Sequence, residues 1–297
     1  MTAPPPSKSA IWILAARPKT LWAAVAPVVL GSAMALEAGV FHGWSAFMTL
    51  LAAVLIQVGT NFSNDYHDFV KGADTAARKG PLRVTQAGLV RPDQVRRAAL
   101  FVFGFAFIAG IYLIWRGGWV ILLIGVLSIF FGILYTAGRY SLAYLGLADI
   151  FVFVFFGPVA VAGTFYVQAL EITPVVIVAG LAPGFLSMAI LLVNNIRDID
   201  EDREAGKRTL VVRTGRTFGV ALYLACFAGA GVTTLVVVAM SPGHWWALAA
   251  LIIVPIGVMN TTRLERSGDP AVLNPLLGTT AQMLLVYCIL FSIGWNV

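Results

Sequence analysis

The chain has 297 residues, of which 59% are hydrophobic and only 11% are charged, and its formal net charge is +6 at pH 7. A soluble domain needs about a quarter charged residues to cover its surface, so this composition excludes a soluble globular protein and indicates an integral membrane protein. The positive charge does not indicate nucleic-acid binding, because the Lys and Arg residues lie in short segments between apolar runs. We therefore expect the lipid bilayer, and no nucleic acid, among the partners.

Nine apolar runs follow a Pro-rich N-terminal tail, and each is close to the roughly 20 residues that a helix needs to cross a bilayer. The sequence thus predicts an all-α protein with nine transmembrane helices, in one membrane-embedded domain over residues 1–297, with a flexible tail at 1–10. If the N-terminus is cytoplasmic, every Lys and Arg except Arg116 lies on the cytoplasmic side, as the positive-inside rule requires. The nine predicted spans are residues 21–36, 44–61, 98–115, 119–135, 145–168, 174–195, 218–240, 245–260 and 276–295.

A polar stretch closes the second predicted span. If the helix continues, Asn61, Asp65 and Asp68 follow one another at i, i+4 and i+7, and Asn64 is four residues before Asp68. A carboxylate at membrane depth is costly and usually faces a cavity or pairs with a cation. This stretch is therefore a candidate site, and basic residues follow it directly: Lys71, Arg78 and Arg83.

A second stretch repeats the pattern after the sixth predicted span. Asn194, Asp198 and Asp202 fall at i, i+4 and i+8, with Asn195 one position round the helix, and Lys207 and Arg208 follow. Both stretches end even-numbered spans, so both lie on the cytoplasmic side and can face each other across a helix bundle. We interpret them as two halves of one site, with cytoplasmic active-site loops over residues 62–97 and 197–217.

The residue types in the two stretches indicate their chemistry. Carboxylate and amide oxygens without His or Cys favour Mg²⁺, with Mn²⁺ as a substitute, and Mg²⁺ prefers one or two carboxylates together with substrate phosphates. The basic residues downstream suit a diphosphate, because they neutralise the phosphate oxygens that the metal leaves free. A cavity that opens from lipid suits a substrate with a long apolar tail. An allylic prenyl diphosphate has both this tail and an anionic head.

The cytoplasmic loop after the fourth predicted span contains Tyr135, Arg139 and Tyr144. Tyrosine rings can shield a cationic intermediate and an Arg can hold a departing diphosphate, although an interfacial aromatic belt explains the same residues. Near the N-terminus, Arg17 and Lys19 are either topology anchors or substrate-binding residues, with Arg17 suited to a substrate carboxylate.

Two other interpretations compete with an enzyme. Each acidic cluster alone could be a solvated helix end with capping and ion-pair duties, but two matching clusters on one side disfavour this. A magnesium or anionic-lipid transporter would also need acidic residues, but it should place them near the membrane midplane or on both sides.

At these residues the sequence resembles the UbiA superfamily of intramembrane prenyltransferases, whose members have nine transmembrane helices and two aspartate-rich motifs after helices two and six. The strings GTNFSNDYHDFVKGADT, GPLRVTQAGLV and NNIRDIDEDREAGKRTLVVRTG are similar to one branch, the 1,4-dihydroxy-2-naphthoate polyprenyltransferases of menaquinone synthesis. The first motif departs from the family pattern at Gly72, where an acid is expected, and the nearest acid is Asp74. The weakest match to this branch is residues 136–141.

The resemblance implies transfer of a polyprenyl group to 1,4-dihydroxy-2-naphthoate with loss of diphosphate and CO₂, which forms demethylmenaquinone. Other aromatic acceptors of the superfamily, namely homogentisate, 4-hydroxybenzoate and chlorophyllide, remain alternatives. It also implies a multi-pass protein of the cell inner membrane with its active site facing the cytoplasm, whereas the oligomeric state leaves no signature in the sequence. By this resemblance the metal ligands are Asn64, Asp68, Asp198 and Asp202; the catalytic residues are Asp65, Asp68, Asp198, Asp202, Tyr135 and Tyr144; and the substrate-binding residues are Arg17, Lys19, Asn61, Lys71, Arg78, Arg83, Arg139, Asn195, Lys207 and Arg208.

Overall fold

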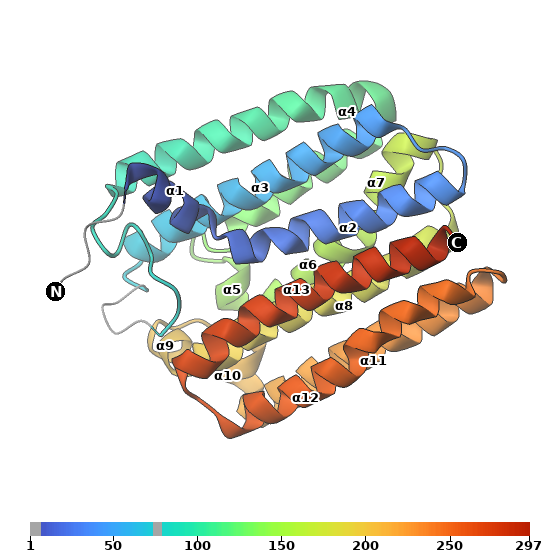
Figure 1. The fold of residues 1–297 in the computed structure, drawn as a ribbon. Helices are drawn as coiled ribbons and strands as arrows, with labels where there is room; N and C mark the ends of the chain where they lie inside the picture. Colours follow the sequence, from blue (N-terminus) through green and yellow to red (C-terminus); the bar gives the residue numbers. More distant parts are fainter. Residues whose placement is uncertain (1–6, 74–78) are drawn as a thin grey trace.

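A computed structural model describes residues 7–73 and 79–297, and within these ranges every regular element is a helix and there is no strand. Eight helices are long and apolar enough to cross a membrane, and they run side by side as one bundle (Figure 1). The predicted all-α, multi-pass membrane architecture is confirmed. These eight are α2 (Pro18–Glu37), α3 (Gly43–Val70), α4 (Pro92–Leu134), the interrupted helix α6 (Ala148–Val154), η1 (Phe155–Val159) and α7 (Ala160–Ala169), then α8 (Pro174–Arg197), α11 (Arg216–Met240), η2 (Trp245–Ile252) with α12 (Ile253–Arg266), and α13 (Pro270–Trp295).

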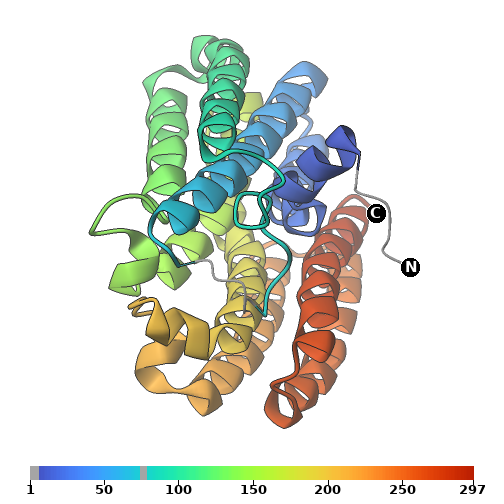
Figure 2. The ribbon, with the colours of Figure 1, turned by 90° about the vertical axis from the view of Figure 1, so that its left-hand side faces the viewer.

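Helix α4 contains two of the predicted spans, because the chain reverses direction inside it. Gly118 has φ 66° and ψ −154°, a conformation that glycine adopts without the steric cost of a side chain. A Cβ added to Gly59 of α3 would lie 2.7 Å from the Phe103 ring, and one added to Gly132 would lie 2.5 Å from Oγ1 of Thr60. Both halves of α4 therefore pack on the same turn of α3, and they lie next to each other as two helices in Figure 2. When α4 is counted as two segments, each of the nine predicted runs falls in a helix.

Several predicted boundaries are wrong at the end of the bundle that carries the polar stretches. Residues 8–10 belong to helix α1 (Lys8–Ala16) rather than to a flexible tail, because the Ser7 hydroxyl accepts from the Ala10 N–H and Trp12 packs edge-on against Phe62 at 5.5 Å. Residues 62–70 continue α3, and residues 92–97 start α4, so the predicted loop 62–97 is shorter than expected. The predicted loop 197–217 contains two short helices, α9 (Ile199–Glu204) and α10 (Leu210–Thr214).

The basic residues gather at the same end of the bundle. The starts of α2, α4, α11 and α13 and the ends of α3, α8 and α12 meet there, together with α5 (Leu142–Leu145), α9 and α10 (Figure 1). Arg116 lies at the opposite end, where it donates to the carbonyls of Val167 and Gln168. The helix directions thus reproduce the one-sided distribution of charge that the sequence indicates.

Helix α8 is central to the bundle and contacts α11, α13 and the interrupted helix α6–η1–α7. The interruption lies at Gly157 and Pro158, where the backbone approaches α8 closely. A Cβ added to Gly180 would lie 2.7 Å from Cα of Pro158, and one added to Gly157 would lie 2.7 Å from the carbonyl oxygen of Gly180. Small residues at this crossing let two backbones meet without side chains between them, as in many membrane helix pairs.

We expect Gly180→Ala to destabilise the protein by about 1–3 kcal/mol, because the added methyl group meets backbone atoms that have no room to move. Gly104→Ala is the matched control, since an added Cβ there has no neighbour within 4 Å. Thermal unfolding of the two variants in the same detergent checks the prediction. Equal stability of the two variants would contradict the close packing at this crossing.

Candidate active site

The two polar helix ends meet through one ammonium group. The Lys207 Nζ lies 3.3 Å from Oδ1 of Asp202 in α9 and 3.7 Å from Oδ1 of Asp68 near the end of α3. Both carboxylates are buried, and Oδ2 of Asp68 also accepts a hydrogen bond of 3.2 Å from Nη2 of Arg83. The predicted convergence of the two stretches therefore occurs, with Lys207 as the bridge.

Burial and charge act in opposite directions on this ion pair. Burial raises the pKa of Asp202 to about 6, helped by the charges of Asp198 and Asp68 and opposed by Lys207. Burial alone would lower the pKa of Lys207, but the neighbouring Asp68 and Asp202 raise it to about 12. At neutral pH the carboxylate of Asp202 is therefore ionised and Lys207 is charged, so a cation and an anion stabilise each other away from water.

Asp198 has a different partner from the other two acids. Arg197, whose side chain is fully buried, contacts both carboxylate oxygens of Asp198 at 2.6 and 2.7 Å. The same guanidinium donates to Oδ1 of Asn194 at 2.6 Å and to Oδ1 of Asn274 on α13 at 2.9 Å. Asn274 in turn donates to the carbonyl of Lys79 at 3.1 Å. This network ties the end of α8 to α13 and to the segment that follows the first polar stretch.

The polar residues of α3 take different directions. Asn64 lines the central cavity and accepts a hydrogen bond from Thr136 at 2.9 Å, and Asp68 lines the same cavity. Asn61 also lines it, but its amide donates to the Ala16 carbonyl at 2.8 Å and to Thr20 at 3.1 Å, which fastens α3 to the α1–α2 junction. These contacts give Asn61 a structural role next to the site.

Asp65 does not line the cavity. It is 1% exposed, beside the backbone of Val84 and Thr85 and within the field of Arg17. Its position therefore gives no support to the predicted catalytic role.

Lys71 organises the loop after α4 instead of pointing into the cavity. Its Nζ donates to the carbonyls of Thr136 and Gly138, at 2.5 and 2.7 Å, and lies 4.1 Å from the centroid of the Tyr144 ring. Burial lowers the pKa of Lys71, with Lys207 adding to this effect and Asp68 opposing it. Lys71 and Tyr144 thus form a clamp on the loop beside the cavity.

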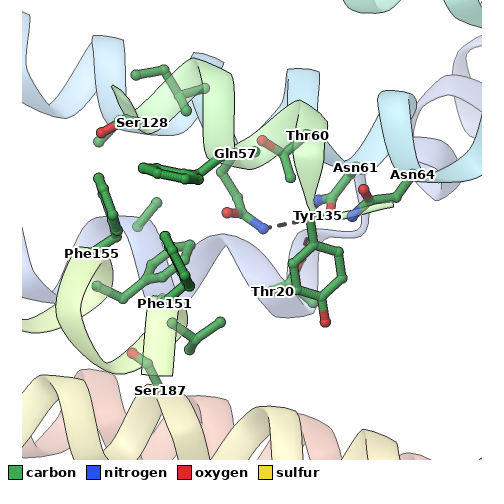
Figure 3. Close-up of a pocket in the computed structure, with 18 of the residues that line it drawn as sticks. Thr20, Gln57, Thr60, Asn61, Asn64, Ser128, Tyr135, Phe151, Phe155 and Ser187 are labelled. Atoms are coloured by element: carbon green, nitrogen blue, oxygen red, sulfur yellow. Dashed lines mark hydrogen bonds between the residues drawn. The ribbon is translucent and has the colours of Figure 1, made fainter. Parts of the chain in front are cut away.

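Tyr135 is the aromatic residue of that loop that reaches the cavity (Figure 3). Its pKa lies above the ordinary value, first because of burial and then because of the charges of Asp149, Asp202 and Asp68. Its ring therefore stays neutral beside the buried acids, where it can stabilise a nearby cation.

The remaining predicted residues fall into three groups. Arg17, with a left-handed backbone at φ 52°, and Lys19 line the cavity at the start of α2, and Arg17 donates to the Asn61 carbonyl at 3.5 Å. Arg139 and Arg208 are exposed and do not line the cavity, so their positions give no support to a diphosphate-binding role. Arg78 and Asp74 lie outside the described residues.

The cavity has a volume of about 630 Å³ and changes character along its length. At one end it is lined by Asn64, Asp68, Asp198, Asp202 and Lys207. From there it continues between α2, α3, α4 and α7, past apolar residues such as Ile56, Ile121 and Val167. It is thus a compartment with a charged head and a long apolar arm.

The acids fit a divalent cation in chemistry, although they are not gathered into a ready-made group. Among the described residues, no three His, Cys, Asp or Glu side chains are close enough to hold one metal ion. However, Asp68 and Asp202 already share one positive charge, Lys207, and the predicted ligand atoms are all oxygens. Mg²⁺ favours oxygen ligands, so the residues present suit this ion once Lys207 moves from the two carboxylates toward a bound substrate.

Comparison with known proteins agrees with this arrangement. The model of the UbiA prenyltransferase family matches residues 24–291. The chain belongs to this family. It is 36% identical over 295 residues to the 1,4-dihydroxy-2-naphthoate octaprenyltransferase of Escherichia coli (strain K12), which covers 97% of this chain and 96% of the relative. It is also 36% identical over 280 residues to the enzyme of the same name from Mycobacterium tuberculosis (strain ATCC 25618 / H37Rv), with 94% of each chain covered.

Solved structures show the same fold at much lower identity. A UbiA homolog from Archaeoglobus fulgidus bound to GPP and Mg²⁺ matches with a TM-score of 0.69 and 14% identity, covering 95% of this chain and 99% of the other. The apo structure of a UbiA homolog from Aeropyrum pernix K1 matches with a TM-score of 0.63 and 17% identity, over 93% and 96% of the two chains. The helix bundle described above is therefore the UbiA fold.

Sequence reasoning missed two residues of this UbiA site, Arg197 and Asn274, and one buried acid beside it, Asp149. Arg197 lies inside the second motif, between Asn195 and Asp198, but we counted it only as a topological charge. Asn274 belongs to no motif, and only the packing of α13 brings it to the site. Asp149 is buried near Tyr135, and neither of its carboxylate oxygens has a hydrogen-bond partner among the described residues. The one signal for it in the sequence was an acid at the start of an apolar run.

We expect Arg197→Lys to destabilise the protein by about 1.5–3 kcal/mol, because a lysine keeps the charge but loses the two-point contact with Asp198 and the bonds to both asparagines. Arg208→Lys makes the same exchange at an exposed position and should leave stability unchanged. Thermal unfolding in detergent, without added ligands, compares the two. If both variants unfold at the same temperature as the wild type, the Arg197 network does not hold the end of α8.

Proposed function

We propose that this protein transfers a polyprenyl group from an allylic polyprenyl diphosphate to 1,4-dihydroxy-2-naphthoate, with loss of diphosphate and CO₂. The product is a prenylated naphthoquinol, the reduced form of demethylmenaquinone, and the pathway is menaquinone synthesis. The observation that carries this proposal is a single cavity with a charged end and an apolar arm, which suits an anionic head on a long hydrocarbon tail. The likeness over nearly the whole chain to dihydroxynaphthoate octaprenyltransferases supports the choice of acceptor.

The charged end suits the diphosphate. Asn64, Asp68, Asp198 and Asp202 would hold Mg²⁺ there, and the ion would supply positive charge to the leaving diphosphate oxygens. Lys207 and Arg83 already lie against Asp68, and both are placed to bind the phosphate oxygens that enter between the acids. Departure of the diphosphate leaves an allylic cation on the first isoprene unit.

The cation forms where the charged end meets the apolar arm. Tyr135 lines the cavity at this boundary and presents a neutral ring that can stabilise the cation. The walls beyond it are hydrocarbon, so they keep water away from a carbon that water would convert to a prenol. The electron-rich naphthol ring attacks this carbon, and loss of CO₂ then restores the aromatic ring.

The apolar arm accepts the rest of the chain. On α3 the cavity is lined from Thr49 to Asp68, which spans about 28 Å at the rise of an α-helix. Most of this length is apolar on the facing helices, so a long prenyl chain can extend through the bundle toward its other end. The length of the natural chain is set by the shape of this arm and its opening to lipid.

The charge distribution favours one orientation. We infer that the polar end of the bundle faces the cytoplasm, because Lys and Arg residues gather there and the positive-inside rule favours that side. In a bacterial cell, the membrane that borders the cytoplasm is the inner membrane. Water-soluble dihydroxynaphthoate and Mg²⁺ would then reach the site from the cytoplasm.

Two alternatives are less well supported. Transfer to homogentisate, 4-hydroxybenzoate or chlorophyllide would need the same diphosphate-binding end of the cavity. However, the two relatives reported above are both named for dihydroxynaphthoate as the acceptor. Transport of magnesium or an anionic lipid would need buried charges along a path, whereas Asp68, Asp198 and Asp202 are gathered at one end.

We expect Asp68→Asn and Asp202→Asn each to lower prenyl transfer at least 100-fold while the protein stays folded, because each variant removes a charge that would hold the metal and keeps the size of the side chain. Asp93→Asn, at the exposed start of α4, is the matched control and should keep full activity. Mass spectrometry of the products, after incubation with Mg²⁺, dihydroxynaphthoate and prenyl diphosphates of several lengths, provides the measurement.

Two outcomes would contradict the proposal. Substantial activity in either acidic-site variant would remove these carboxylates from the chemistry. Prenylation of 4-hydroxybenzoate or homogentisate in preference to dihydroxynaphthoate, by the wild type, would reassign the acceptor but leave the reaction type intact.

A further inference from the structure

Two buried polar atoms on α8 face the cavity without a partner. Ser187 is 2% exposed and Asn195 is 4% exposed, and both line the cavity. Neither Oγ of Ser187 nor Nδ2 of Asn195 has a hydrogen-bond partner among the described residues. The two residues are eight positions apart, so they lie on the same side of the helix, one toward the apolar arm and one at the charged end.

A hydrocarbon tail cannot satisfy these atoms. A buried donor without a partner costs about 1–3 kcal/mol, and contact with a prenyl chain would leave that cost in place. Ser and Asn at these positions therefore indicate a ligand with polar groups, bound at the side of the cavity that α8 forms. The diphosphate does not explain Ser187, because the charged side chains Arg197 and Asp198 lie about three turns further along the chain, at the end of α8.

An aromatic wall lies in the same part of the cavity. Phe151 and Phe155 are nearly parallel, at 7° with centroids 6.2 Å apart, and Phe131 of α4 lies 4.4 Å from the first and 5.5 Å from the second. All three line the cavity, and Figure 3 shows Phe151 and Phe155 above the hydroxyl of Ser187. Such a wall packs well against the face of a flat ring.

We propose that the Ser187–Asn195 side of α8 and the Phe131–Phe151–Phe155 wall form the subsite for the aromatic acceptor, separate from the diphosphate end and from the prenyl arm. The ligand class is a fused or single aromatic ring with hydroxyl groups on opposite sides. Eight residues of helix rise about 12 Å along the axis, so a hydroxylated ring system that lies along this face of α8 has one unpartnered polar group near each of its ends. This subsite rests on the proposed function, since it places the acceptor of that reaction.

Ser187→Ala removes the hydroxyl that would bond to the acceptor, and Ser187→Val in addition fills the space that the acceptor would occupy beside it. For the full-length protein in detergent with Mg²⁺, we expect Ser187→Ala to raise the KM for dihydroxynaphthoate about three- to tenfold, as the loss of one hydrogen bond would. We expect Ser187→Val to raise it further, and we expect the KM for the prenyl diphosphate to stay within twofold in both variants. Ser292→Ala also removes a buried hydroxyl without a hydrogen-bond partner among the described residues, but Ser292 lies on α13 and does not line the cavity, so this matched control should change neither KM.

A binding measurement gives a second result that does not depend on turnover. Calorimetric titration with dihydroxynaphthoate, in the presence of an unreactive thiolodiphosphate analogue of the prenyl substrate, should show the same loss of affinity in the Ser187 variants. An equal rise in KM for both substrates, or weaker binding of the thiolodiphosphate analogue, would assign this wall to the prenyl arm and overturn the proposal. Unchanged KM and unchanged affinity in both Ser187 variants would overturn it as well.

Failure of the proposed function gives a different result. If the wild type prenylates another hydroxylated aromatic in place of dihydroxynaphthoate, the same variants are measured with that acceptor, and the subsite stands or falls on its KM. If the wild type transfers no prenyl group to any aromatic acceptor, the proposed function fails first, and the subsite fails with it because no acceptor exists to occupy it.

Discussion

The site depends on charge balance inside a membrane protein. Asp68, Asp198 and Asp202 are buried at one end of the bundle, and each is held by a cation: Arg83 and Lys207 for Asp68, Arg197 for Asp198, and Lys207 for Asp202. The three negative charges and the three positive charges therefore cancel, which lowers the free-energy cost of burying them. An anionic diphosphate or a divalent cation alone would change this balance, whereas the charges of the two together largely offset each other. In the proposed function they would therefore enter as a pair.

The fold serves this balance by extending two helices beyond their apolar parts. Helix α3 stays helical through Val70, so Asn64 and Asp68 remain inside the protein instead of entering a solvated loop. The end of α8 is fixed in the same way by the network from Arg197 to Asn274. Lys71 holds the loop after α4 against the end of α3. Rigid helices rather than free loops therefore position the acids, and this precision is what metal-assisted chemistry needs.

The sequence predicted this arrangement well where helical spacing decides it. The polar stretches, their common side and the position of Asp68 and Asp202 in one cavity all follow from periodicity and charge. Spacing could not separate Asp65 from Asp68, because residues three apart share a helix face and a small rotation decides which one reaches the cavity. It also could not find Asn274, which comes from a distant helix. Nor could it identify Arg197 as the partner of Asp198, since a positive charge at the end of a membrane span is already accounted for by the positive-inside rule. The contact between Arg197 and Asn274 depends on the packing of α8 against α13, two helices that are far apart in the sequence.

The polarity of the cavity also limits where the acceptor can bind. The reacting carbon of a prenyl diphosphate is bonded directly to the diphosphate, so it must lie at the edge of the charged end, close to Asn64 and Tyr135. The acceptor must meet that carbon from a side that neither phosphate nor prenyl chain occupies. The face of α8 from Asn195 to Ser187 begins at this edge and carries hydrogen-bonding atoms that a hydrocarbon would leave unsatisfied. Charge at one end, hydrocarbon along one arm and unpaired polar atoms on a third side therefore divide one cavity among three chemical groups.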